Sequence, residues 1–119
     1  MKRRDVLIYL NDMLDNINRI LKFTHDIQYE DFSQNDEKIY AVLKAIEIVG
    51  EAAKKIPKTY REKYSYIPWP DIAGMRDKLV HEYFGVDLKI IWATAKQEIP
   101  LLKANLEKIL KDFKEAADG

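Results

Sequence analysis

Residues 76–83 gather four reactive kinds of side chain in a short stretch of the chain. Arg76, Asp77, His81 and Tyr83 supply a guanidinium, a carboxylate, an imidazole and a phenol. Arginine holds phosphate oxygens through paired hydrogen bonds, and histidine is the side chain whose proton moves most readily near neutral pH. The other histidine, His25, lies in a polar connection and is expected to be a solvated surface residue. The stretch therefore predicts chemistry on a phosphodiester.

Helical geometry divides these four residues into two groups. Asp77 and His81 are four positions apart, so they lie on nearly one line of a helix, where a hydrogen bond would orient the imidazole and favour its protonated form. Arg76 and Tyr83 are seven apart and share another line, and Arg76 lies about 140° around the axis from His81. One subunit does not easily unite the two groups. A second subunit packed on this helix would complete the site.

Cleavage of RNA without a metal needs a group that removes the 2′-hydroxyl proton, a group that protonates the leaving oxygen, and a cation beside the phosphorane. An imidazole and a guanidinium supply these functions. No second histidine lies nearby and no HExxH-like spacing occurs, so a metal route is disfavoured. The structural alternative is a salt-bridged helix face, with Tyr83 as a core or interface residue.

The composition predicts a globular protein with a single domain, residues 1–119. Apolar residues make up 47% and charged residues 34%, which excludes intrinsic disorder. The absence of cysteine excludes disulfides and thiolate metal sites and makes the cytoplasm the expected location. No apolar run reaches membrane-spanning length, so no membrane contact is expected.

The charges cancel overall but are unevenly distributed. The chain has 20 basic and 20 acidic residues, so any contact with nucleic acid must be local. Residues 26–37 carry five acidic residues and no basic one, whereas residues 54–63 carry Lys54, Lys55, Lys58, Arg61 and Lys63 against Glu62 alone. Each segment is either a solvated face or a contact with a partner or RNA.

Apolar residues recur every three or four positions along most of the chain, which predicts an all-α fold. The expected helices cover residues 4–23, residues 36–55, a short piece at 58–64, a stretch with Asp71 in its first turn that runs to about Phe84, a helix from Leu88 capped by Asp87, and a final amphipathic piece. The helix at 36–55 is apolar on two sides, so it is expected to be sandwiched in its bundle and against a second subunit.

Prolines and tryptophans give further local predictions. Pro68 and Pro70 predict an extended segment that fixes Trp69, and Pro100 predicts a break or kink in the last long helix. Trp69 and Trp92 are expected to be packing residues.

The arrangement Arg76-x4-His81-x-Tyr83 resembles the signature of the HepT-like toxins, a branch of the HEPN ribonuclease superfamily. The resemblance covers most of the chain without large insertions. It extends to residues 9–14, 50–55, 67–69, 72–77 and 79–87 and to Trp92. Relatives commonly carry asparagine after the arginine, where this chain has Asp77. Because the wider HEPN pattern accepts a polar residue there, we interpret the difference as variation that affects rate and pH optimum.

The resemblance implies an antiparallel HEPN-type bundle of about four or five helices. It implies a homodimer in which the motif-bearing helices line a shared cleft, and a metal-independent endoribonuclease toxin that needs no cofactor. In that family Arg76 would stabilise the phosphate, His81 would be the acid–base group, and Asp77 would support it. RNA, not DNA, would be the substrate.

The resemblance also implies a partner and a modification. A nucleotidyltransferase antitoxin of the MntA type would silence the toxin by transferring AMP from ATP to Tyr83, in a complex that includes the homodimer or a larger hetero-oligomer. The alternative is a non-catalytic helical subunit that binds substrate or nucleotide for such a nucleotidyltransferase, and a further one is a purely structural dimer. No sequence pattern indicates whether tRNA or mRNA is the target.

Overall fold

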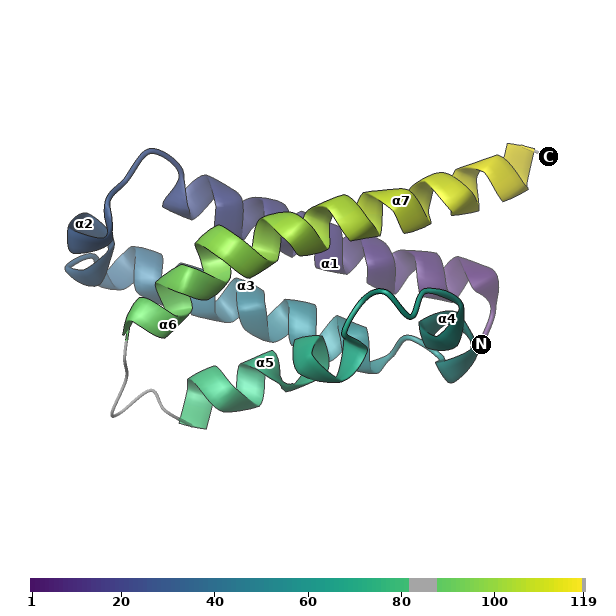
Figure 1. Ribbon diagram of the computed structural model, residues 1–119, viewed down its shortest axis with the longest axis horizontal. Helices are drawn as coiled ribbons and strands as arrows, with labels where there is room; N and C mark the ends of the chain where they lie inside the picture. The colour runs from purple at the N-terminus through teal and green to yellow at the C-terminus, as the bar shows by residue number, and fades with distance from the viewer. Residues whose placement is uncertain (82–87, 119) are drawn as a thin grey trace.

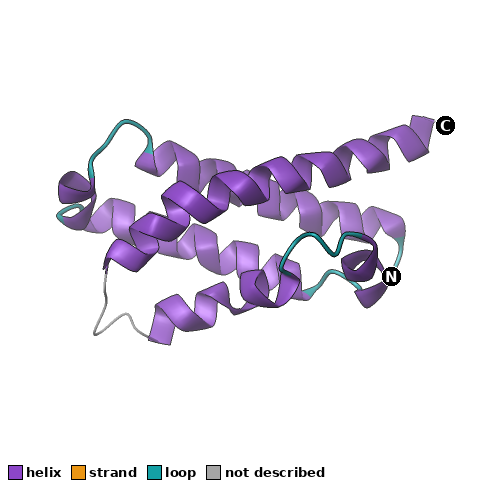
Figure 2. Cartoon of the chain, in the orientation of Figure 1, coloured by secondary structure: helices purple, strands orange, loops and turns teal. Residues whose placement is uncertain are grey.

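The computed structural model describes residues 1–81 and 88–118 as an elongated bundle of helices, 49 × 28 × 21 Å (Figure 1). No strand occurs among these residues, so the predicted all-α fold is confirmed (Figure 2). The elements are α1 (Arg3–Thr24), α2 (Tyr29–Ser33), α3 (Asp36–Lys54), α4 (Lys58–Lys63), α5 (Trp69–His81), α6 (Leu88–Ala93), a π-helical segment (Thr94–Glu98) and α7 (Ile99–Asp118). None of the described helices is both long and apolar enough to cross a membrane.

Helix α3 is the centre of the bundle because two of its faces are apolar. It packs against α1 on one side and α5 on the other. Ile39, Val42, Ile46 and Val49 are buried at helical spacing, and small residues such as Ala45 add a second buried line. Sandwiching within the bundle is therefore confirmed. Contact with a second subunit stays a prediction.

Helices α1 and α7 complete the core through their own apolar stripes. On α1 the buried residues recur every three or four positions: Val6, Leu10, Met13, Ile17 and Ile20. The stripe of α7 includes Leu102, Leu106, Ile109 and Phe113, and α7 packs on α1. Arg3 ties the start of α1 to α7 because its Nη2 donates a hydrogen bond to the Phe113 carbonyl at 2.8 Å.

The extended segment predicted around Trp69 is wrong, because residues 64–67 form a turn and a bend in which the Ile67 N–H donates to the Tyr64 carbonyl at 3.1 Å. Helix α5 begins at Trp69, and Pro70 occupies its first turn, where a missing N–H costs nothing. The indole is fixed by a hydrogen bond, since Nε1 of Trp69 donates to the Tyr64 carbonyl at 3.1 Å in a buried position. Residues 82–84, where α5 was expected to end, and Asp87, the expected cap of α6, lie outside the described residues.

Pro100 does not break the last helix. Helix α6, the π segment and α7 follow one another directly as a long rod (Figure 1), with Pro100 in the first turn of α7. The irregularity lies just before the proline, where the Ile99 N–H donates to the Thr94 carbonyl five residues back. The wider π turn thus avoids the steric clash that the proline ring would make with the preceding turn of a regular α-helix.

Candidate active site

Helix α5 is held firmly at its beginning and along one face. Trp69, Ile72 and Met75 are buried at helical spacing and face α3. Asp71 lies in the first turn, as predicted, where a carboxylate suits the helix dipole. The helix therefore starts from a fixed point beside α4 and leads into the stretch that carries the candidate residues.

Arg76, Asp77 and His81 all lie on α5. Asp77 is exposed, so its carboxylate is accessible to solvent and to a neighbouring group. The side chains of Arg76 and His81 are outside what the structure describes, and Tyr83 lies outside the described residues. The Asp77–His81 hydrogen bond and the alignment of Arg76 with Tyr83 therefore stay predictions.

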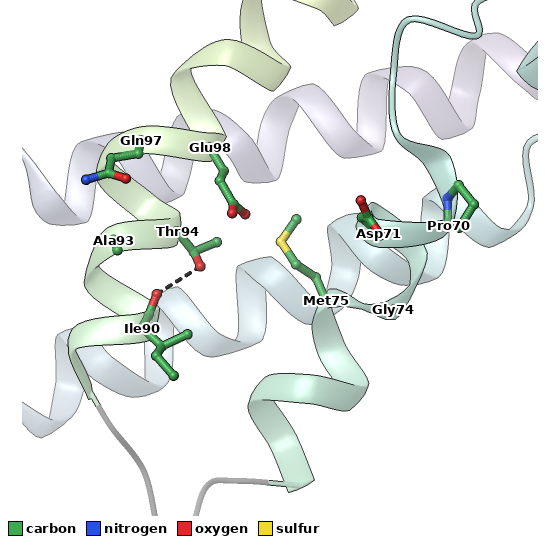
Figure 3. Close-up of a pocket in the computed structure, with 9 residues that line it drawn as sticks. All are labelled: Pro70, Asp71, Gly74, Met75, Ile90, Ala93, Thr94, Gln97 and Glu98. Carbon is green, nitrogen blue, oxygen red and sulfur yellow. Dashed lines mark hydrogen bonds between the residues drawn. The ribbon is translucent and has the colours of Figure 1, made fainter.

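A cavity of about 570 Å³ lies between α5 and the rod formed by α6 and the π segment (Figure 3). Its lining residues are Pro70, Asp71, Gly74, Met75, Ile90, Ala93, Thr94, Gln97 and Glu98. A second cavity of about 230 Å³ shares Asp71, Met75 and Glu98 with the first and continues toward α7. Among the lining residues that the structure describes, Asp71 and Glu98 carry carboxylates and none is basic.

The far wall of the larger cavity is anchored to the rest of the bundle. Trp92 of α6 packs on Phe32 of α2, with ring centroids 5.1 Å apart. Lys96 in the π segment donates from Nζ to the Thr24 carbonyl at the end of α1, at 3.0 Å. Thr94 Oγ1 donates to the Ile90 carbonyl at 2.8 Å. The predicted packing role of Trp92 is thus confirmed, and these contacts hold the wall in place against α1 and α2.

No pattern in the sequence indicates this cavity directly. Pro100 marks an irregularity in the rod, but the π turn places Thr94, Gln97 and Glu98 along the cavity, and only the fold shows that. Gly74 was part of the family resemblance without an assigned role. Among the residues described, no group of three or more histidine, cysteine, aspartate or glutamate side chains could hold a metal ion.

The comparison with known proteins decides the family. A model described as "Ribonuclease HepT-like" matches residues 13–109, which include all of α5. The chain belongs to the HepT-like ribonuclease family. This confirms the resemblance expected from the residues around Arg76 and His81.

Several relatives of this HepT-like chain are similar over nearly their whole lengths. "Putative RNase MJ0125" of Methanocaldococcus jannaschii is 51% identical over 97% of this chain and 99% of its own. "Putative RNase MJ1216" of the same organism is 50% identical over 95% of this chain and 93% of its own. "Probable ribonuclease HepT" of Thermococcus cleftensis is 46% identical over 87% of this chain and 94% of its own. No solved structure matches the chain significantly.

Gly74 gives a first test of the cavity in this HepT-like protein. A Cβ built at Gly74 meets nothing within 4 Å, and the residue has ordinary helical backbone angles. We expect Gly74→Ala to raise the free energy of unfolding by about 0.5–1 kcal/mol, because alanine restricts the unfolded chain and suits a helix. Urea denaturation measures the effect. Ala73→Gly, one position earlier on α5, is the matched control and should lower stability by a similar amount.

A loss of stability in Gly74→Ala would contradict an open cavity. It would mean that something in the folded protein occupies the space beside Gly74.

Proposed function

We propose that this HepT-like protein is a toxin endoribonuclease that cleaves RNA without a metal, in the cytoplasm, as a single domain. The observation that carries the proposal is the family match across residues 13–109 together with Arg76, Asp77 and His81 on one helix within that range. Relatives named as ribonucleases over nearly the whole chain support the same activity. No cofactor is required by this chemistry.

In the proposed reaction, the imidazole of His81 takes the proton of the ribose 2′-hydroxyl. The 2′-oxygen then attacks phosphorus, and the bond to the 5′-oxygen breaks. The leaving oxygen gains a proton from the protonated imidazole of His81, of either subunit. The products are a 2′,3′-cyclic phosphate and a free 5′-hydroxyl. Arg76 stabilises the extra negative charge of the phosphorane through paired hydrogen bonds. Asp77 supports His81 by orienting the ring.

The proposed site is shared by two subunits. Helical geometry places positions 76 and 81 about 140° apart on α5, which argues for Arg76 of one subunit acting with His81 of the other. A homodimer is therefore the proposed active unit.

Regulation is proposed at Tyr83. A cognate MntA-like nucleotidyltransferase would catalyse attack of the phenol oxygen on the α-phosphorus of ATP, releasing pyrophosphate and leaving AMP on the ring. The added bulk and negative charge would repel the RNA backbone from the cleft. The family match and the position of Tyr83, two residues after His81, support this assignment.

Inducible expression in a bacterial host tests the proposal. Wild type alone should arrest growth, and co-expression of the nucleotidyltransferase encoded beside it should relieve the arrest and place one or more AMP groups on Tyr83, seen by mass spectrometry. Tyr83→Phe should stay toxic in the presence of the partner. If the wild type cuts no RNA and instead binds nucleotide for the partner's reaction, the non-catalytic alternative replaces the proposal.

A further inference from the structure

The C-terminal end of α3 and the short helix α4 form a cationic surface, which we call the basic end. It consists of Lys54, Lys55, Lys58, Arg61 and Lys63. The four lysines are exposed and Arg61 is half-buried. The run 26–37, which holds the chain's acidic segment, lies at the far end of α3, around α2 (Figure 1). The basic and acidic segments of the sequence therefore lie at opposite ends of α3 in the folded molecule.

Acidic neighbours neutralise only part of the basic end. Lys54 lies 3.7 Å from Glu51, and Lys58 lies 3.8 Å from Glu62, both in exposed pairs that contribute little energy. Among the described residues, Lys55, Arg61 and Lys63 form no ion pair, and the buried Nε of Arg61 has no hydrogen-bond partner. Three cations thus remain available to an anionic ligand.

Aromatic rings alternate with the cations of this surface. Lys55 lies over the ring of Tyr9 at 5.6 Å, and Lys63 lies over Tyr64 at 5.4 Å. Tyr64 contacts Tyr66 edge-on, with ring centroids 6.3 Å apart. Tyr66 in turn lies 6.0 Å from the ammonium group of Lys108. The row runs from Lys63 at the end of α4 to Lys108 on α7, and it includes Tyr66, three residues before α5 begins.

Tyr66 is the exposed ring in this row. Half of its surface is accessible, although Tyr64 beside it is buried. Partial burial, with smaller effects from Asp112 and Tyr64, raises the pKa of Tyr66. The ordinary pKa of a tyrosine already lies well above neutral pH, so the ring carries no charge that would repel phosphate. An exposed neutral ring beside cations is the surface on which single-stranded nucleic acids stack their bases.

We propose that the basic end binds the backbone of single-stranded RNA and that Tyr66 stacks on one of its bases. This inference rests on the proposed ribonuclease activity and adds the surface that holds the substrate outside the catalytic residues. Helix α5 begins beside the Tyr64 carbonyl, and positions 76 and 81 follow about 10 and 18 Å further along its axis. A strand of a few nucleotides spans that distance, within the site sizes of proteins that bind single strands.

Acidic protein is the competing occupant of such a surface. The stacking ring favours RNA, because an acidic peptide needs no exposed aromatic face. The described lining of the cavity beside α5 includes the carboxylates of Asp71 and Glu98 and no cation, whereas the basic end supplies cations next to the start of that helix.

Fluorescence anisotropy with a fluorescein-labelled single-stranded oligoribonucleotide tests the proposal. All variants are made in the His81→Ala protein, so that binding is measured without cleavage. Lys55→Glu with Lys63→Glu should weaken binding roughly tenfold or more and reduce the slope of log affinity against log salt by about 1.4, the value for two phosphate contacts. Lys22→Glu with Lys44→Glu changes net charge equally at exposed positions away from the basic end and should leave both quantities nearly unchanged.

Tyr66 is tested separately in the same assay. Tyr66→Ala should weaken binding roughly fivefold or more, whereas Tyr66→Phe, which keeps the ring, should bind like the parent. Far-ultraviolet circular dichroism confirms that each variant is folded. Polyglutamate serves as an anionic competitor without bases and should displace RNA less effectively than unlabelled oligouridylate.

Four results would overturn the inference: equal weakening by the two lysine pairs, unchanged binding in Lys55→Glu with Lys63→Glu, unchanged binding in Tyr66→Ala, or equal competition by polyglutamate. The last would assign the surface to an acidic protein. The failure of this inference can be told apart from failure of the proposed function. If the wild type cleaves RNA but Lys55→Glu with Lys63→Glu binds RNA normally, the ribonuclease activity stands and only RNA binding by the basic end is refuted. If that double variant loses RNA binding but the wild type cleaves no RNA, the basic end stands and the ribonuclease activity is refuted.

Discussion

Replacing His81 with alanine is expected to lower RNA cleavage by roughly 10²- to 10⁴-fold, the usual contribution of a general acid–base group. The imidazole is the group of the motif able both to take and to give a proton near neutral pH, and water is a much weaker substitute. Cleavage of a labelled RNA in the presence of EDTA measures the effect. The wild type should remain active in the chelator and leave 2′,3′-cyclic phosphate ends.

His25 provides the matched control for this substitution. Its side chain is 77% exposed and its Nε2 lies 3.1 Å from Asp26 Oδ2, at the end of α1. His25→Ala removes the same chemical group at a solvated position and should retain wild-type activity. Full activity in a folded His81→Ala protein would exclude the assigned mechanism, and loss of activity in EDTA would exclude a metal-independent reaction.

Periodicity predicted most of the helices because their burial is regular. Val6, Leu10 and Ile17 face the core from α1 at the spacing seen in the sequence, and the expected bounds of 4–23 match Arg3–Thr24 closely. The two-sided pattern of α3 likewise predicted its central position. These features depend on local spacing and on the need to bury apolar surface, both of which are readable from a single chain.

The features that escaped prediction depend on contacts between distant segments. Pro70 and Pro100 were expected to interrupt regular structure, but each lies in the first turn of a helix, where its missing N–H is tolerated. The rod is held on the bundle by contacts such as that of Trp92 with Phe32, and the pattern of local residues does not distinguish a π turn from a break before Pro100. The cavity beside Gly74 follows from that packing and has no counterpart in local sequence.

The candidate site was predictable in residue type but only partly in arrangement. The spacing placed Arg76 and His81 on one helix, and α5 carries both. Their separation around the axis indicated that one subunit is insufficient. Whether the two act within one subunit or across two depends on assembly, which single-chain geometry does not fix, so an experiment on mixed dimers is decisive.

Mixed dimers of Arg76→Ala and His81→Ala subunits should recover RNA cleavage that neither variant shows alone. In a two-fold symmetric dimer with sites built across the interface, one site of the mixed dimer receives both intact residues and the other receives neither. The expected activity is about half that of the wild-type dimer. If each subunit instead used its own Arg76 and His81, both sites of the mixed dimer would lack one residue and the activity would stay at the level of the single variants.

Two affinity tags on co-expressed subunits allow the mixed dimer to be isolated by sequential purification, and cleavage of labelled RNA is then measured per dimer. A dimer that carries Arg76→Ala and His81→Ala together in one subunit, paired with a wild-type subunit, is the control with the same composition. Sites across the interface leave that control with one residue missing from each site, so it should be nearly inactive. If each site lies within one subunit, the control dimer should be about half active, because its wild-type subunit is complete. The control dimer would then be more active than the mixed dimer, the reverse of the order expected for sites across the interface. The ranking of the two dimers therefore assigns the origin of Arg76 and His81 even if the absolute rates differ from wild type.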